Sequence, residues 1–98
     1  MITDEAEFMD RANWGESHSG NPICTVEMES DDGSYTMEYT VVIFPKPAEA
    51  FPRPQPAAWG FVIYWDDERG ANKVFGRNRY STEERARAWA WIRLELLI

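Results

Sequence analysis

The residues of this sequence that could perform chemistry are one histidine, one cysteine and two acidic turns. His18, the only histidine, lies between two serines in the segment "GESHSG". A serine hydrolase needs a nucleophile, a base and an orienting acid brought together, and neighbouring side chains in a loop do not provide that geometry. Cys24 alternates with Val26 and Met28 on the apolar side of a predicted strand, where a thiol packs as a small hydrophobic group. Neither residue indicates catalysis.

The two acidic turns, "ESDDGS" (29–34) and "WDDERG" (65–70), have the charge to attract a hard cation. Neither fits a calcium-binding loop, because Met28 would occupy an oxygen-ligand position and the closing glutamate is missing. The sequence also contains no glycine-rich phosphate loop, no Cys/His metal spacing and no dinucleotide fingerprint. We therefore expect no enzyme activity, no metal and no cofactor.

The charge of the chain is divided along its length. Residues 1–68 contain 14 Asp and Glu against 3 Lys and Arg, a net charge of −11, whereas residues 69–98 contain 3 against 7, a net charge of +4. A strongly acidic surface repels phosphate backbones and attracts basic protein surfaces. We therefore expect a basic protein or ribonucleoprotein partner and no direct binding of nucleic acid.

Length and composition predict one folded domain. The chain has 98 residues, of which 44% are hydrophobic and 14% aromatic, too apolar for a disordered protein. A single cysteine allows no internal disulfide, and no signal peptide or membrane-spanning apolar stretch is visible. We therefore expect a domain spanning residues 1–98, a cytoplasmic location and no membrane partner.

Alternation of apolar and polar residues predicts two β-hairpins, in segments 23–44 and 58–79. The first hairpin turns within residues 30–33, and the polar face of its second strand includes Glu38. One face of each hairpin is strongly apolar. These apolar faces consist of Tyr35, Met37, Tyr39, Val41 and Ile43 in the first hairpin and Trp59, Phe61, Ile63 and Trp65 in the second.

Two helices and a proline-rich connector complete the predicted fold. Asp4 is suited to cap a short helix over residues 4–12, and Ser81 with Glu84 forms a capping box before the C-terminal helix. Five of the six prolines lie in residues 45–56, which we expect to be a stiff connector between the hairpins. The predicted fold class is α+β, with a four-stranded, mainly antiparallel sheet from two hairpins and the C-terminal helix packed on one face.

The C-terminal helix has apolar residues on two sides, so only one side can lie on the sheet. We predict that Trp89 and Ile92 pack against Phe61 and Ile63. The other side is then either covered within the monomer or contacts a second copy or a partner. The residues predicted for such a dimer or partner contact are Trp91, Leu94 and Ile98.

Basic residues offer a smaller alternative surface. Lys73, Arg77 and Arg79 share one face of the last predicted strand, which would make a small basic patch. The arginines of the C-terminal helix project in different directions and do not form the single stripe of a groove-binding helix. We therefore favour the acidic region as the working surface.

The segment Val74–Trp91, a strand followed by an S-x-x-E cap and a Trp-bearing helix in a small acidic chain, resembles phage and mobile-element proteins that include some anti-CRISPR inhibitors. Acidic surfaces of such inhibitors commonly occupy sites that a host complex uses for nucleic acid. The resemblance implies a non-catalytic phage inhibitor in the bacterial cytosol that binds a basic surface of a host defence complex by nucleic-acid mimicry.

Two other classes of protein fit the same composition. Bacterial immunity proteins and antitoxins are small and acidic and neutralise basic toxins by the same electrostatic attraction. A small structural or adaptor subunit would instead use the apolar side of the C-terminal helix.

The predicted partner-binding residues lie in the first hairpin and in the second acidic turn. No Lys or Arg occurs between residues 12 and 45, so negative charge there is not offset locally. The residues are Glu27, Glu29, Asp31, Asp32, Glu38, Asp66, Asp67 and Glu68.

Overall fold

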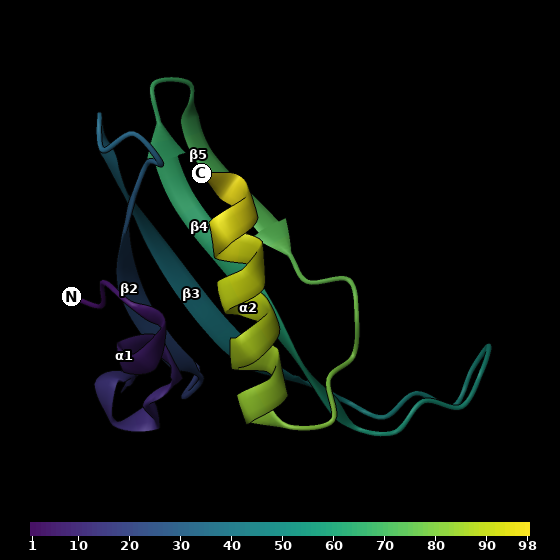
Figure 1. The fold of residues 1–98 in the computed structure, drawn as a ribbon. Coiled ribbons are helices and arrows are strands. Elements are labelled where there is room, and N and C mark those ends of the chain that lie inside the picture. Colours follow the sequence, from purple (N-terminus) through teal and green to yellow (C-terminus); the bar gives the residue numbers. More distant parts are fainter.

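Strands that follow one another in the sequence are neighbours in a single antiparallel sheet, ordered β1-β2-β3-β4-β5. The computed structural model describes residues 1–98 (Figure 1). The elements are α1 (Glu5–Met9), the 3₁₀ turn η1 (Arg11–Asn13), β1 (Gly15–Glu16), β2 (Pro22–Glu29), β3 (Thr36–Lys46), β4 (Ala58–Asp67), β5 (Gly70–Phe75) and α2 (Glu83–Leu97). The α+β class and the antiparallel sheet agree with the sequence.

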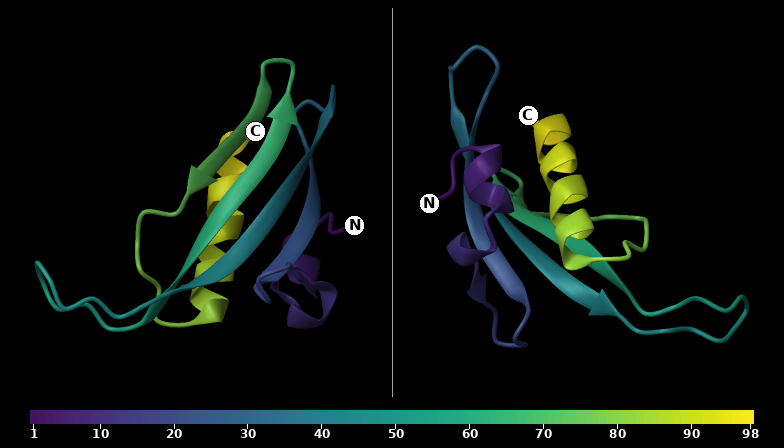
Figure 2. Two further views of the ribbon diagram at one scale, coloured as in Figure 1. Left: turned by 180° about the vertical axis from the view of Figure 1, so that it is seen from behind. Right: turned by 60° about the horizontal axis from the view of Figure 1, so that its bottom comes forward.

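Both helices lie on the same face of the sheet. The ring centroids of Phe8 in α1 and Trp91 in α2 are 5.2 Å apart, and Arg11 forms an ion pair of 2.7 Å with Glu83 at the start of α2. Seen from behind, the opposite face of the sheet carries no helix (Figure 2). We call this opposite side the open face.

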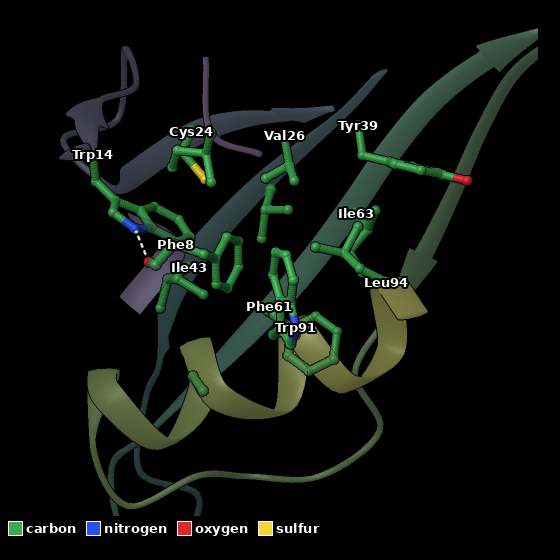
Figure 3. Packing of buried hydrophobic residues seen from close by; sticks show 14 of the residues in the cluster. Phe8, Trp14, Cys24, Val26, Tyr39, Ile43, Phe61, Ile63, Trp91 and Leu94 are labelled. Atoms are coloured by element: carbon green, nitrogen blue, oxygen red, sulfur yellow. Dashed lines mark hydrogen bonds between the residues drawn. The ribbon is translucent and has the colours of Figure 1, made fainter. Parts of the chain in front are cut away.

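The core lies between the sheet and the two helices (Figure 3). Val41 and Ile43 of β3 and Ile63 of β4 are fully buried, and Phe61 is nearly so. Burying such a side chain stabilises a fold by about 1.5–3 kcal/mol. The apolar faces predicted for the two hairpins therefore point into the core, where Met37, Trp59 and Trp65 lie at its margin. Tyr35 is the exception, because it precedes β3 and is exposed in the turn.

The N-terminal helix begins where the sequence predicts. The Asp4 carboxylate accepts a hydrogen bond of 2.8 Å from the backbone N–H of Glu7 and so caps the first turn. The α-helix ends at Met9, earlier than the predicted residue 12, because Asp10 caps the separate turn η1. The indole N–H of Trp14 then donates to the Phe8 carbonyl at 2.7 Å, which fixes this segment on the core.

The sheet has five strands and not the predicted four. The two-residue strand β1 pairs with the start of β2, through Gly15↔Ile23 and Glu16↔Pro22. β3 and β4 also pair with each other, from Thr40↔Tyr64 to Lys46↔Ala58. The proline-rich segment is therefore the loop of a third hairpin and does not merely connect two separate ones.

Residues 47–57, which we call the proline arm, project from the body of the protein (Figures 1 and 2). Glu49 and Gln55 exchange two backbone hydrogen bonds, of 2.8 and 2.7 Å, across the arm. At its base, Nη2 of Arg79 donates to the carbonyls of Pro47 and Pro56, each at 2.7 Å. One guanidinium thus joins both strands of the arm.

The cap of α2 is Thr82, and the predicted cap Ser81 is wrong. Oγ1 of Thr82 accepts a hydrogen bond of 3.1 Å from the backbone N–H of Arg85. Serine and threonine have the same capping chemistry, so the S-x-x-E pattern placed the start of the helix one residue early.

The side of α2 that faces the sheet is opposite to the predicted one. Trp91 and Leu94 are buried, whereas Trp89 and Ile92 are 50% and 44% exposed. Ala86 and Ala90 lie on the side of α2 that faces the sheet and have no exposed surface. Their small side chains allow the helix to approach the sheet closely. With Ile98 also packed against the core, the residues predicted for a dimer or partner contact, Trp91, Leu94 and Ile98, are used inside the monomer.

Candidate functional site: an acidic end of the sheet

The two acidic turns lie at the same end of the sheet. The β2–β3 turn and the β4–β5 turn are both reached at the upper end in Figure 1, because successive strands of an antiparallel meander alternate in direction. All eight predicted partner-binding residues are exposed. We call this group the acidic end: Glu27, Glu29, Asp31, Asp32, Glu38, Asp66, Asp67 and Glu68.

No carboxylate of the acidic end is neutralised by an ion pair. The three ion pairs of the protein use only Glu49 and Glu83 as acids. Arg69, within the second acidic turn, takes part in no ion pair, and Lys73 of β5 has its ammonium 5.6 Å from the centre of the Phe75 ring. The eight charges therefore add to a negative potential that attracts cationic surfaces and weakens as salt rises.

Two of the carboxylates oppose each other directly. Glu27 of β2 pairs with Glu38 of β3, and both side chains project from the open face because their neighbours Val26 and Tyr39 point into the core. Like charges at directly opposed positions destabilise a sheet. The sheet thus retains an unfavourable pair at the acidic end, a local conflict of the kind expected where a surface serves binding.

Asp32 also builds its turn, as Asp67 does in the β4–β5 turn, where Oδ1 of Asp67 accepts a hydrogen bond of 2.8 Å from the backbone N–H of Arg69. Oδ1 of Asp32 accepts hydrogen bonds from the Ser34 backbone N–H at 2.9 Å and from the Ser30 hydroxyl at 2.8 Å. These bonds from Ser34 and Ser30 lower the pKa of Asp32 to about 2. Gly33 completes the turn with φ of 71°, a conformation that favours glycine.

A notch separates the tips of the two hairpins. Pairing of β3 with β4 ends at Thr40↔Tyr64, and beyond this pair a hollow of about 460 Å³ opens between the strands. Glu38 and Asp66 line it together with Tyr64 and Trp65. The notch offers two carboxylates beside aromatic surface, an arrangement suited to a lysine or arginine side chain.

The residues considered for catalysis stay apart. His18 lies exposed in the loop between β1 and β2. Cys24 is buried, and desolvation raises the pKa of its thiol to about 12, although the charge of Arg87 acts in the opposite direction. No group of three His, Cys, Asp or Glu side chains is arranged to hold a metal ion.

The small basic patch predicted from Lys73, Arg77 and Arg79 does not form. β5 ends at Phe75, so the last two arginines no longer alternate with Lys73 on one strand. Arg79 instead binds the proline arm, where its guanidinium lies 3.6 Å from Glu49 in addition to the two proline carbonyls.

Sequence reasoning missed a second surface, a groove between α2 and β5. Trp89, Ile92 and Leu96 form an exposed apolar stripe along one side of it. Their spacing of three and four residues is visible in the sequence, but apolar periodicity alone predicts that they face the core. Small alanines on the opposite side of the helix were the signal that could have reversed this prediction.

Comparisons with known proteins add no functional information. No protein-family model, no curated protein and no solved structure matches the chain significantly. Neither helix combines the length and apolar character that crossing a bilayer requires.

Proposed function

We propose that the protein is a non-catalytic inhibitor that covers a basic surface of a partner protein or ribonucleoprotein complex with its acidic end. The supporting observation is that eight exposed carboxylates, from two hairpin turns and the strand ends beside them, lie at one end of the sheet without an ion pair among them. Basic surfaces of this kind often bind nucleic acid, so the acidic end would compete with a phosphate backbone.

Electrostatic attraction defines how such an inhibitor acts. Unpaired charges at one end of an elongated molecule, with extents of 47 × 31 × 25 Å, speed the encounter with a cationic partner and orient the acidic end toward it. Insertion of a lysine or arginine into the notch between Glu38 and Asp66 would then slow dissociation. This mode of action requires no catalytic group, and a phage anti-defence inhibitor would fit it.

The test is charge reversal with a matched control. The variant Asp31→Lys/Glu38→Lys/Asp66→Lys changes both hairpins but spares Asp32, whose carboxylate holds the turn. The control, Glu5→Lys/Glu16→Lys/Glu95→Lys, makes the same change in net charge at exposed positions elsewhere.

Tagged parent, variant and control are used to capture partners from bacterial lysate, with identification by mass spectrometry at low and high salt. We expect the variant to lose a basic partner that the parent and the control retain. The affinity of the purified partner should fall by about 1 kcal/mol or more, roughly fivefold in Kd. If variant and control lose the partner equally, net charge and not the acidic end is responsible, and the proposal is wrong.

An immunity protein that neutralises a basic toxin is the alternative within the same electrostatic class. The captured partner separates the two, because a toxin would be an enzyme whose activity the protein blocks, whereas a defence complex would lose its nucleic acid. An adaptor role rests on a different observation, the exposed stripe of Trp89, Ile92 and Leu96. Adaptor binding through that stripe would survive high salt.

A further inference from the structure

The groove between α2 and β5 is lined mostly by hydrophobic residues. It measures about 390 Å³ and has Val74, Phe61 and Tyr80 toward the sheet and the stripe of Trp89, Ile92 and Leu96 on the helix. Tyr80 stacks between Phe61 and Trp89, with ring centroids 5.9 and 6.3 Å apart. Exposed apolar surface gathered in a preformed groove marks an interaction site more often than scattered apolar residues do.

The two edge regions of the sheet differ in whether further backbone pairs with them. The β2 edge is covered, because β1 pairs with its first residues and Ile2 bridges to Val26 through hydrogen bonds with Thr25 and Glu27. The β5 edge pairs with β4 only and has no strand on its outer side. An open edge presents backbone donors and acceptors that can pair with an added strand.

The charges around the groove are positive. Arg77 and Arg93 are the only charged residues that line it, and their side chains take part in no ion pair or hydrogen bond within the protein. Lys73 of β5 is paired with Tyr64 of β4, and paired residues project from the same face of a sheet. Tyr64 projects from the open face because its neighbour Ile63 points into the core, so Lys73 also projects from the open face. A strand added to β5 would therefore meet apolar surface on its groove side and Lys73 with Phe75 on its other side.

A second copy of this chain does not suit these charges. Antiparallel pairing of two β5 edges around a two-fold axis would bring Lys73 near Lys73 and the groove arginines near one another, which is unfavourable. We propose that the groove and the β5 edge bind an extended segment of a partner protein in which apolar and acidic residues alternate. Apolar side chains fill the groove beneath α2, carboxylates on the opposite side of the added strand pair with Lys73, and a carboxylate beyond the apolar side chains pairs with Arg77 or Arg93 in the groove.

This surface uses other side chains than the acidic end, although β5 begins beside Asp66 and Asp67, and its partner has the opposite charge. The experiment is a selection of random 12-residue peptides displayed on their own mRNA, against the immobilised parent protein. Enriched peptides are synthesised with a fluorescent label, and their affinities are measured by anisotropy. We expect apolar–acidic alternation in the enriched sequences, and slower hydrogen exchange over residues 70–75 when a peptide is bound.

Variants connect the selected peptides to the groove. Ile92→Asp, at an exposed position, should weaken binding by about tenfold or more. Arg77→Glu/Arg93→Glu should select basic peptides in place of acidic ones. Phe51→Asp makes the same kind of change at the tip of the proline arm, where the side chain is 86% exposed, and should leave peptide affinity unchanged.

Four results would overturn the proposal. They are the absence of enriched peptides, enrichment without acidic residues, binding that Ile92→Asp does not weaken, and a parent protein that dimerises through β5 in sedimentation equilibrium. Ile92→Asp lies on α2, away from both acidic turns, and should leave capture of a basic partner by the acidic end unchanged, so failure of this proposal and failure of the proposed function are separable.

Discussion

The orientation of α2 can be tested with two tryptophans on the same helix. Trp91 is 7% exposed and lies against Phe8, whereas Trp89, two residues earlier, is 50% exposed and stacks only on Tyr80. Replacing a buried tryptophan by alanine typically costs about 3–5 kcal/mol. At a half-exposed position the loss should be about 1–3 kcal/mol, because half burial contributes only about half of the 1.5–3 kcal/mol of full burial and the single stack adds about 0.5–1.5 kcal/mol.

The comparison cancels the change in helix propensity, because both variants exchange the same residue types within one helix. Trp91→Ala should therefore be less stable than Trp89→Ala by about 2 kcal/mol, or about 8 °C or more in Tm for a domain of this size. Urea titration followed by circular dichroism measures the free energy of unfolding, and the slope of the titration tests for a common denatured state. Equal stability, or greater damage from Trp89→Ala, would mean that α2 presents its other side to the sheet.

Three further predictions address the arm, the thiol and the acidic end. Arg79→Lys should speed proteolysis within residues 47–57, because an ammonium does not reproduce the forked hydrogen bonds to the two sides of the arm, while Arg53→Lys should not. Cys24 should react with Ellman's reagent at pH 8 far more slowly in the folded protein than in urea, since its buried thiol, with a pKa of about 12, stays protonated; a rapid reaction of the folded protein would contradict its placement. Glu38→Gln should stabilise the protein by about 0.2–1 kcal/mol in low salt, with the gain shrinking at high salt, because it removes the repulsion from Glu27; a loss of stability would refute this repulsion.

The parts of the fold that could be predicted are those where the local sequence pattern favours a single structure. The inward faces of β3 and β4 follow from strict alternation, as in Tyr39, Val41 and Ile43, and the Asp4 cap follows from a polar residue before a short apolar helix. β1 has only two residues, Gly15 and Glu16, and so has no alternation to detect.

The orientation of α2 was not predictable from apolar periodicity, because the helix has apolar residues on nearly every side. Tertiary packing determines which side of α2 lies on the sheet. Ala86 and Ala90 allow the helix to approach the sheet closely, and Phe8, distant in the sequence, provides a contact for Trp91. The groove depends on this orientation and was therefore missed as well.

The acidic end was predicted as residues but not as one site. Charge counting identified both turns, yet their placement at the same end depends on β3 and β4 being neighbours in the sheet. The proline-rich segment obscured that pairing, because prolines usually interrupt strands, while here Pro45 lies within β3 opposite Trp59.

The contact between α1 and α2 must form late during synthesis of the chain on the ribosome. Arg11 and Glu83 are 72 positions apart. The contact between α1 and α2 therefore cannot form until almost the whole chain has been synthesised. The strands can pair in turn as they emerge, but the apolar side of β3 and β4 stays uncovered until residues 83–97 have been made. Contacts between distant segments slow folding, since loop closure must come first, and an uncovered sheet is prone to aggregate. The contacts of α1 with α2 are thus among the last native contacts to form.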